Sequence, residues 1–246
     1  MVSPPTTDRR VPQSGLGWEW TARGGELVTH FAGARVWQGP GGFEGTAWLV
    51  DDAPAPHHLL GGLAVLLTHR LGGGVFHAAS VELDDAVVAF IGPSGAGKST
   101  ACRHVEGAPL VSVDRLALLP MPVSPLRPLL RPGPGWFSHP LPGGTRPVPD
   151  MPGALPGWRP LAAVLRVQKA AAATAIIAPT SPASAVTMLR ESTFQTGLRP
   201  SAEQELLAAL DQLVQHVPVA RLELQLGASL KPLLRRWLKS QAEERR

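Results

Sequence analysis

The stretch that decides the fold of this 246-residue chain is Gly92-Pro93-Ser94-Gly95-Ala96-Gly97-Lys98-Ser99-Thr100. It satisfies the pattern G-x-x-x-x-G-K-[ST] in every defined position. The apolar run 86–91 comes immediately before it and is typical of a buried strand, and residues 99–105 can continue as a helix. Strand, glycine loop and helix in this order predict a phosphate-binding loop.

Each residue type in this loop has a chemical reason to be there. Glycines let the backbone curl round an anion, because a Cβ would clash or forbid the dihedral angles. Successive N–H groups and the positive end of the helix then point at the β-phosphate of a nucleotide. Lys98 is expected to reach the β- and γ-phosphates, and the Ser99 hydroxyl to hold Mg²⁺. The predicted nucleotide-binding residues are Gly92, Ser94, Gly95, Ala96, Gly97, Lys98, Ser99 and Thr100.

The composition favours a globular protein with a substantial core. Hydrophobic residues make up 44% of the chain and charged residues 17%. The single cysteine, Cys102, excludes a disulfide framework and a cysteine metal cluster, and we expect it to be a buried packing residue. Residues 1–10 lack the apolar centre of a signal peptide, and no apolar stretch is long enough to span a bilayer. We therefore expect a cytoplasmic protein without a membrane partner.

Positive charge gathers at the end of the chain. The formal net charge is +4, and residues 231–246 carry six Lys and Arg residues against two Glu residues. We interpret this segment as a solvated helix face rather than a docking site. Basic and aromatic residues do not interleave, and no nucleic-acid-binding motif occurs, so nucleic acid is not an expected partner. The oligomeric state stays open, and a homo-oligomer is compatible with the sequence.

The composition divides the chain into four segments. Residues 1–16 are rich in Pro, Ser and Thr and are predicted to be disordered. Residues 17–58 read as short strands with glycine-rich turns, which predicts a small β-rich lobe. Residues 59–240 contain the glycine loop, and residues 241–246 form a basic tail. Within the third segment, 120–160 holds thirteen of the chain's twenty-six prolines and is expected to be a loop insertion, because proline suits neither helices nor sheet interiors.

Strands and helices alternate around the glycine loop, which places the core in the α/β class. The turn Asp84-Asp85 separates two of the expected strands. The expected strands of the core are 75–83, 86–91, 110–114, 161–167, 173–178 and 219–226. The expected helices are 59–71, 99–105, one that starts at Pro182 after the N-cap Ser181, one that opens with a capping box of Ser201 and Gln204 and ends at His216, and 228–243.

Absent motifs narrow the class of phosphate-loop protein. The chain has no asparagine, so it lacks the N-K-x-D motif that reads guanine, and it lacks the L-S-G-G-Q signature of transporter ATPases. Asp114 is the sole acidic residue between Gly107 and Pro149 and ends an apolar strand. Phosphoryl transfer needs a carboxylate near Mg²⁺, either to hold the ion or to accept the proton of the attacking hydroxyl. Asp114 is therefore a candidate for both roles, with a simple turn residue as the alternative.

The residues around the loop resemble a known family. The segment 76–83, the short turn, the apolar strand and the glycine loop look like the kinase domain of HPr kinase/phosphorylase, and more closely like the short HPr-kinase-like proteins of peptide-modification gene clusters. The apolar strand that carries Asp114 and the segment 217–224 are also similar to that family. The resemblance is most specific over about 60–120 and weaker over 161–240. The Pro-rich centre has no counterpart that we can name.

The resemblance implies a phosphoenolpyruvate-carboxykinase-like α/β core and transfer of phosphate from Mg²⁺-ATP to a serine hydroxyl. It assigns His77 and Asp114 to the active site, whereas a lone histidine on a strand is by itself more often a packed core residue. One position departs from the family, which has two adjacent aspartates where this chain has Val113 and Asp114. The amino-terminal domain that builds hexamers is not evident either, so HPr itself is not the expected substrate.

The leading hypothesis is an ATP-dependent kinase that phosphorylates a Ser or Thr hydroxyl of a peptide or protein. A ribosomally made precursor peptide is a plausible acceptor, by analogy with the short relatives. The expected catalytic residues are Lys98, Asp114 and His77, and the expected metal ligands are Ser99 and Asp114. Two alternatives stay open: an accessory module that binds ATP without transferring phosphate, and a kinase that acts on a small molecule.

Overall fold

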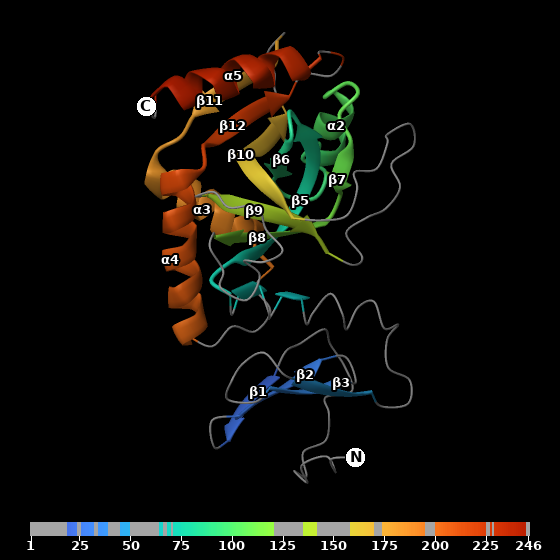
Figure 1. Cartoon of the computed structure of the whole chain (residues 1–246), viewed down its shortest axis with the longest axis vertical. Helices are drawn as coiled ribbons and strands as arrows, with labels where there is room; N and C mark the ends of the chain where they lie inside the picture. The colour runs from blue at the N-terminus through green and yellow to red at the C-terminus, as the bar shows by residue number, and fades with distance from the viewer. Residues whose placement is uncertain are drawn as a thin grey trace.

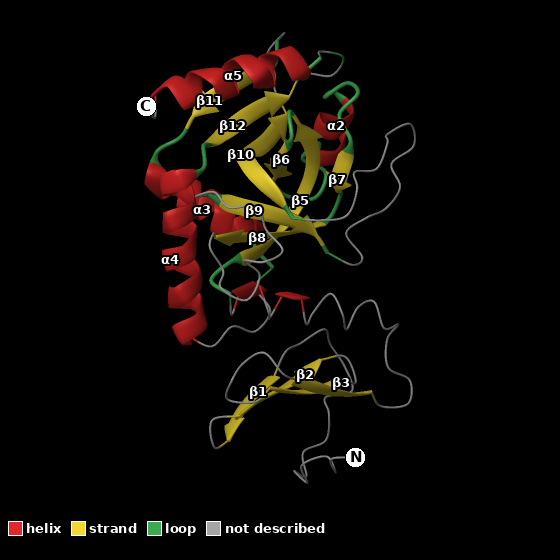
Figure 2. Ribbon diagram, in the orientation of Figure 1, coloured by secondary structure: helices red, strands yellow, loops and turns green. Residues whose placement is uncertain are grey.

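The computed structural model describes part of the chain. The strands within 19–49 are described by their backbone, and the remaining described residues are 64–65, 68–69, 71–120, 135–141, 158–169, 174–194, 200–224, 227 and 229–244. Within these residues a mixed eight-stranded sheet and four helices form an α/β core (Figure 1). Figure 2 shows the strands of this core gathered between helices. The α/β class predicted from the sequence is confirmed.

A separate four-stranded sheet comes before the core. Its strands pair in chain order, and each neighbouring pair is antiparallel. They are β1 (Glu19–Arg23), β2 (Glu26–Phe31), β3 (Ala34–Gln38) and β4 (Gly45–Leu49). The short strands predicted within residues 17–58 are confirmed. The predicted disorder of 1–16 and most of the predicted helix 59–71 lie outside the described residues.

The core sheet combines parallel and antiparallel pairs. Its strands are β5 (Gly74–Leu83), β6 (Ala86–Ile91), β7 (Leu110–Ser112), β8 (Arg115–Pro120), β9 (Trp136–Pro140), β10 (Arg159–Lys169), β11 (Ile176–Pro179) and β12 (Val219–Leu224). The order is β11-β12-β10-β6-β5-β8-β9, and β7 pairs with β5. Only β6, β10 and β12 run parallel to one another among these strands, and the other pairs are antiparallel. Since β9 also pairs with β10, the strands β5, β6, β10, β9 and β8 close into a ring.

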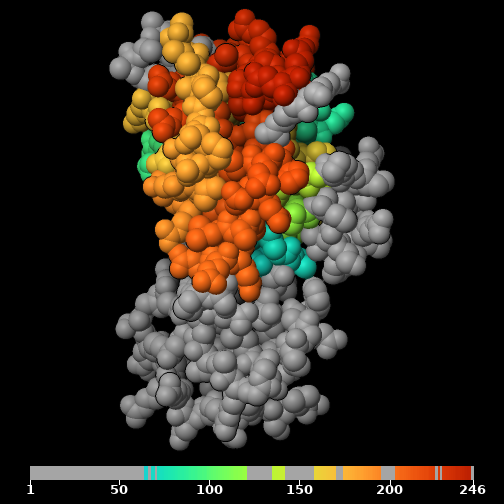
Figure 3. All heavy atoms as spheres, turned by 90° about the vertical axis from the view of Figure 1, so that its left-hand side faces the viewer, coloured from blue at the N-terminus to red at the C-terminus, as the bar shows by residue number. Residues whose placement is uncertain are grey.

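Helices cover both faces of this sheet. The helices are α2 (Lys98–Arg103), α3 (Pro182–Ser192), α4 (Pro200–His216) and α5 (Lys231–Glu244). On β6, Val87 and Ala89 join the apolar cluster beneath α3 and α4, whereas Val88 and Phe90 join the cluster beneath α2 and α5. Apolar side chains on both faces of a strand are typical of a sheet that is buried on both sides. Figure 3 shows the side of the molecule that α3, α4 and α5 form.

The strand expected to end at Asp114 is shorter than predicted. It ends at Ser112, and Val113 and Asp114 form a bend before β8. The reason lies in β5, which pairs with β8 up to His77 and with β7 from Ser80 onward. Val113 and Asp114 lie between the residues that pair in β7 and β8, so they are outside the β-ladder. Asp114 therefore lies in a bend between two strands rather than on a strand end.

The expectation that 120–160 is a loop insertion is wrong for its middle. Residues 136–140 form β9, which pairs with β8 and with the start of β10. Trp136 and Phe137 are buried in this strand, and their burial outweighs the poor strand propensity of the neighbouring prolines. The rest of the Pro-rich segment, up to residue 157, lies outside the described residues apart from Gly135 and Leu141.

The predicted helix ends are confirmed in part. The Ser181 hydroxyl accepts a hydrogen bond from the Ser184 amide at the start of α3, as a cap does. Helix α4 begins at Pro200, and the Ser201 side chain on which the predicted capping box depends lies outside the described residues. Helix α5 begins at Lys231 and continues to Glu244, through most of the predicted basic tail. No helix in the described ranges is long and apolar enough to cross a membrane.

Candidate functional site

The glycine loop joins β6 to α2 and has the backbone that its glycines predict. Gly92, Gly95 and Gly97 have φ angles of 142°, 77° and 101°, which side-chain-bearing residues rarely adopt. A Cβ at Gly92 would lie 3.1 Å from the Val167 carbonyl oxygen, and one at Gly97 would lie 3.2 Å from a Leu224 methyl group. The loop therefore turns tightly and packs against β10 and β12 at the same time.

Lys98 folds back into this loop. Its Nζ donates hydrogen bonds to the carbonyl oxygens of Gly92, at 2.9 Å, and Pro93, at 3.1 Å. Burial lowers the pKa of the Lys98 ammonium, and the carboxylate of Asp114 opposes that shift. Carbonyl oxygens thus hold a buried ammonium at the centre of the loop, where phosphate oxygens could serve as its acceptors instead.

The other predicted loop residues occupy the turn and the first turn of α2. Ser94 is exposed, and the Ala96 amide donates to the Pro93 carbonyl oxygen at 3.2 Å. Ser99 and Thr100 are half-buried in the first turn of α2. The structure thus brings the predicted nucleotide-binding residues together in one short loop and helix start. Cys102 is buried further along the same helix, as predicted.

His77 and Asp114 form a pair beside the loop. The His77 Nε2 atom lies 3.2 Å from Asp114 Oδ1. The bend that carries Asp114 is held in place by two hydrogen bonds: the Ala78 amide donates to the Asp114 carbonyl oxygen at 3.1 Å, and the Ser112 hydroxyl donates to the Arg115 carbonyl oxygen at 2.9 Å. Two residues that are 37 positions apart are therefore brought together by the pairing of β5 with the strands on each side of the bend.

The charges of His77, Asp114 and Lys98 influence one another. Burial lowers the pKa of His77 most, the positive charge of Lys98 lowers it further, and Asp114 opposes both. At neutral pH the His77 ring is therefore uncharged and can accept a proton on one nitrogen. A neutral base, a carboxylate and a buried ammonium beside the glycine loop can accept a proton and stabilise an anion in the same place.

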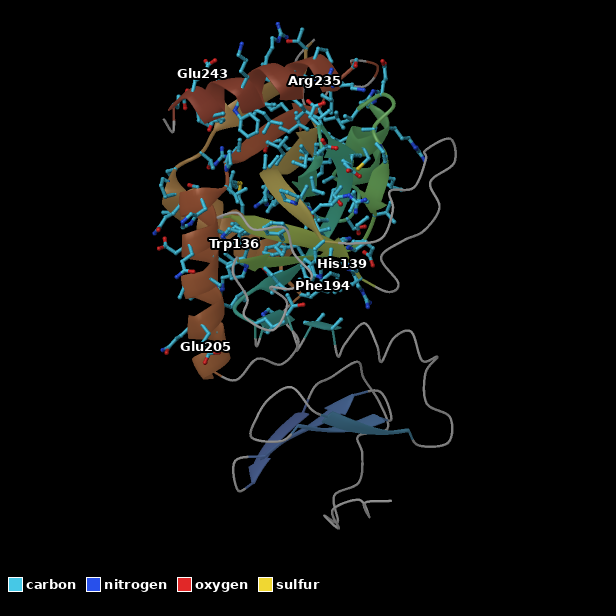
Figure 4. All side chains as sticks on the ribbon, in the orientation of Figure 1. Trp136, His139, Phe194, Glu205, Arg235 and Glu243 are labelled. Atoms are coloured by element: carbon cyan, nitrogen blue, oxygen red, sulfur yellow. The ribbon has the colours of Figure 1, made fainter. Side chains whose placement is uncertain are left out.

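Two further residues contact this pair, and sequence reasoning missed both. Arg115 faces His77 in the register of β5 and β8, and its Nε lies 3.7 Å from Asp114 Oδ2. The Arg115 guanidinium carbon lies 5.4 Å from the centroid of the Phe194 ring, and the rings of Phe194 and His77 are 6.0 Å apart. Arg115 could have been found from the sequence, because it is a basic residue directly after the candidate carboxylate Asp114. No sequence pattern points to Phe194, which is labelled in Figure 4.

Phe194 reaches the site because the chain after α3 returns to β5. The Phe194 amide donates to the Val75 carbonyl oxygen at 2.8 Å, and Thr193 forms a β-bridge with Phe76. His69 Nε2 lies 3.5 Å from the Phe194 carbonyl oxygen. The end of α3 is therefore fixed to the strand that carries His77.

The predicted metal ligands, Ser99 and Asp114, could hold Mg²⁺ only if phosphate oxygens and water supplied the remaining ligands. Among the described residues no three His, Cys, Asp or Glu side chains gather as a metal site would require. Among the described residues, the ion pairs of the Asp114 carboxylate go to His77 and Arg115. Val113, where the resembling family has a second aspartate, is half-buried. Since Mg²⁺ usually keeps several waters and binds through one or two protein ligands and phosphates, one hydroxyl and one carboxylate are compatible with it.

Comparison with known proteins assigns no family to the chain. No protein-family model matches the sequence, and no curated protein is significantly similar to it. What the residues of the site can do therefore rests on their geometry and chemistry.

Proposed function

We propose that this protein is an ATP-dependent kinase that transfers the γ-phosphoryl group to a Ser or Thr hydroxyl of a peptide or protein. The observation that supports the proposal most is the His77–Asp114 pair at the loop that holds the Lys98 ammonium. A P-loop core of the HPr kinase and phosphoenolpyruvate carboxykinase type is part of the proposal, as is a cytoplasmic location. A ribosomally made precursor peptide is the acceptor that we favour.

In this proposal some residues of the site bind Mg²⁺-ATP and others accept the proton of the acceptor hydroxyl. The loop amides and Lys98 would bind the β- and γ-phosphates, with Lys98 exchanging the carbonyl oxygens of Gly92 and Pro93 for phosphate oxygens. Ser99 would hold Mg²⁺ through its hydroxyl, and Asp114 would hold it directly or through water. When bound, Mg²⁺ neutralises charge that develops on the phosphate oxygens.

In the proposed transfer the acceptor hydroxyl loses its proton to the Asp114 carboxylate. Asp114 either keeps this proton or passes it to the neutral His77 ring, which contacts the carboxylate. The hydroxyl oxygen forms a bond to the γ-phosphorus, and the bond from that phosphorus to the β–γ bridging oxygen breaks. The electron pair of the broken bond leaves with ADP. The Lys98 ammonium stabilises the negative charge that gathers on the phosphate oxygens.

A second candidate function is supported by Val113. A site with one carboxylate must use Asp114 both near the metal and near the acceptor, which favours slow or absent transfer. On this reading the protein is an accessory module that binds ATP in order to dock a peptide or a partner enzyme. Tight ATP binding without transfer to any acceptor would identify it.

The test is incubation with γ-labelled ATP, Mg²⁺ and candidate precursor peptides, with ATP affinity measured in parallel. We expect Lys98→Ala to abolish transfer, and Asp114→Asn to keep ATP binding while lowering turnover by about 10²- to 10⁴-fold. Matched controls are Lys239→Ala and Asp211→Asn, which alter exposed residues of α5 and α4. Unchanged turnover in Asp114→Asn would remove the proposed base, and ATP binding without transfer in the wild type would favour the accessory module.

A further inference from the structure

The carboxyl end of β10 extends past the start of the glycine loop. β10 lies beside β6, runs parallel to it and pairs with it up to Arg166, which lies opposite Ile91 (Figure 1). The loop leaves the sheet at the next residue, Gly92, whereas β10 continues for three more residues and ends at Lys169. In sheets with parallel strands, ligands bind outside the carboxyl ends of these strands. Lys169 is therefore at the strand ends where a ligand of the loop would bind.

The loop packs against the residues that surround Lys169. A Cβ at Gly92 would lie 3.1 Å from the Val167 carbonyl oxygen. A Cβ at Gly97 would lie 3.7 Å from a Val167 methyl group and 3.2 Å from a Leu224 methyl group. Val167 is two residues before Lys169 on β10, and Leu224 of β12 pairs with Lys169. Two neighbours of Lys169 thus lie against the glycines of the loop.

Lys169 lies on the face of the sheet that carries α2. Side chains alternate between the two faces along a strand, and directly paired residues share a face. Val167 and Leu224 both belong to the apolar cluster beneath α2 and α5, so Lys169 continues that face. Arg166 and Gln168 lie on the other face, where they line a groove beside α3. The Lys169 side chain is therefore on the same side of the sheet as the loop and its helix.

The charge of Lys169 is not neutralised within the described part of the chain. Lys169 is exposed and makes no hydrogen bond or ion pair with a described residue. Glu223 accepts a hydrogen bond at 3.4 Å from Gln168, with which it pairs on the opposite face. Asp114 is bound to β5, and β5 and β10 flank β6 on its two sides. A ligand in the loop would thus have the Asp114 carboxylate on its β5 side and the Lys169 ammonium on its β10 side.

We propose that Lys169 binds phosphate groups of the ligand in the glycine loop, from the side opposite to Asp114. This inference rests on the proposed function, because it takes the ligand of the loop to be a nucleotide with its phosphates. Lysine binds phosphate as a point charge on a flexible stem, so it can reach a phosphate group from a strand end. Lys98 at the centre of the loop and Lys169 at its side would then share the negative charge of the phosphates.

The first test measures how strongly the ligand protects Lys169 from an amine-reactive reagent. The chain has four lysines, so each can be followed by mass spectrometry after brief acetylation of the whole chain. We expect Mg²⁺-ATP to slow the acetylation of Lys169 about three- to tenfold. Acetylation of Lys239, an exposed residue of α5, should not change. Inorganic triphosphate should also protect Lys169, because it presents phosphate groups without a base or a ribose.

The second test compares variants by their affinity for ATP, measured by calorimetry without an acceptor. Lys169→Gln is expected to weaken binding about three- to tenfold, because a charge-assisted contact is lost. Lys169→Arg keeps the charge and is expected to retain most of the affinity. Arg221→Gln removes the same charge from the opposite face of β12 and should bind ATP like the wild type. The melting temperature of Lys169→Gln should equal that of the wild type, since this side chain is exposed.

The outcomes separate this inference from the kinase proposal. Protection of Lys169 together with weaker ATP binding in Lys169→Gln supports the inference even if no acceptor is phosphorylated, in which case only the kinase proposal fails. If bound ATP does not slow the acetylation of Lys169, or if Lys169→Gln binds ATP like the wild type, the inference is overturned and transfer is still judged with labelled ATP. Equal weakening in Arg221→Gln would reveal an effect of net charge and would also overturn the inference. Protection by triphosphate without any binding of ATP would retain Lys169 as a phosphate ligand and reject the ATP-dependent kinase.

Discussion

At the scale of single residues, the carboxylate of Asp114 is held from two sides. His77 contacts one oxygen at 3.2 Å, and the Arg115 Nε lies 3.7 Å from the other. Phe194 packs against both of these partners. The buried Nε of Arg115 has no hydrogen-bond partner within the described ranges, and an unpaired buried donor lowers the stability of the fold. We interpret Arg115 as a positioning residue that orients Asp114.

On the proposed kinase function, Arg115→Gln is therefore expected to lower kcat about tenfold and to leave the KM for ATP unchanged. Arg115→Lys restores the charge but not the planar contact with Phe194, so it is expected to recover part of the activity. Steady-state kinetics with an acceptor peptide that the protein phosphorylates would measure both effects. Arg103→Gln, an exposed change on α2, is the control. A fall in unfolding free energy that matches the loss of activity would assign Arg115 a purely structural role instead.

At the scale of secondary structure, the turn between β5 and β6 connects the sheet to α5. Asp84 and Asp85 have φ angles of 53° and 64°, the left-handed region that a two-residue type I′ hairpin turn requires. The Arg235 side chain donates two hydrogen bonds to the Asp84 carboxylate, from Nε at 3.0 Å and from Nη2 at 2.6 Å. These hydrogen bonds lower the pKa of Asp84. Figure 4 labels Arg235 on α5.

Asp85→Gly is expected to raise the free energy of unfolding by about 0.5–1 kcal/mol, because glycine adopts the left-handed conformation without strain. Asp84→Gly relieves the same strain but loses the hydrogen bonds from Arg235, so its gain is expected to be smaller. Urea denaturation at pH 7 would compare the two variants. A larger gain for Asp84→Gly than for Asp85→Gly would show that the contact with α5 contributes nothing.

At the scale of the whole molecule, three histidines couple stability to pH. Burial is the largest cause that lowers the pKa values of His69, His77 and His139. A histidine in the unfolded chain titrates near 6.5, so between that value and the lower folded pKa the unfolded chain binds more protons. Stability therefore falls as pH drops below about 6.5 and levels off only below the folded pKa values.

We expect the free energy of unfolding in urea to be lower at pH 5.5 than at pH 7.5. His139→Gln should reduce this difference, because it removes one of the three groups. Asp84 does not interfere in this range, since its pKa is lowered from 3.8 and its contribution is lost only at lower pH. Equal or higher stability at pH 5.5 would contradict the assignment.

Local sequence patterns predicted what short segments can specify alone. The glycine loop depends on residues within a few positions, because its φ angles and the following helix are set by glycine and lysine placement. The strand pair around Asp84-Asp85 and the cap of α3 at Ser181 were predictable for the same reason. These features use hydrogen bonds and sterics between neighbours in the chain.

Only the tertiary structure decided which distant residues meet. The pairing of His77 with Asp114, the ring of Phe194 beside them and the register of Arg166 with Arg221 all depend on strand pairings between segments far apart in the sequence. Strand β9 is the clearest case, since its prolines argue against a strand while burial of Trp136 and Phe137 stabilises one. The sequence by itself determined the backbone of the loop and the helix that follows it. Packing and strand register determined which residues surround the loop, because contacts between distant segments leave no local pattern in the sequence.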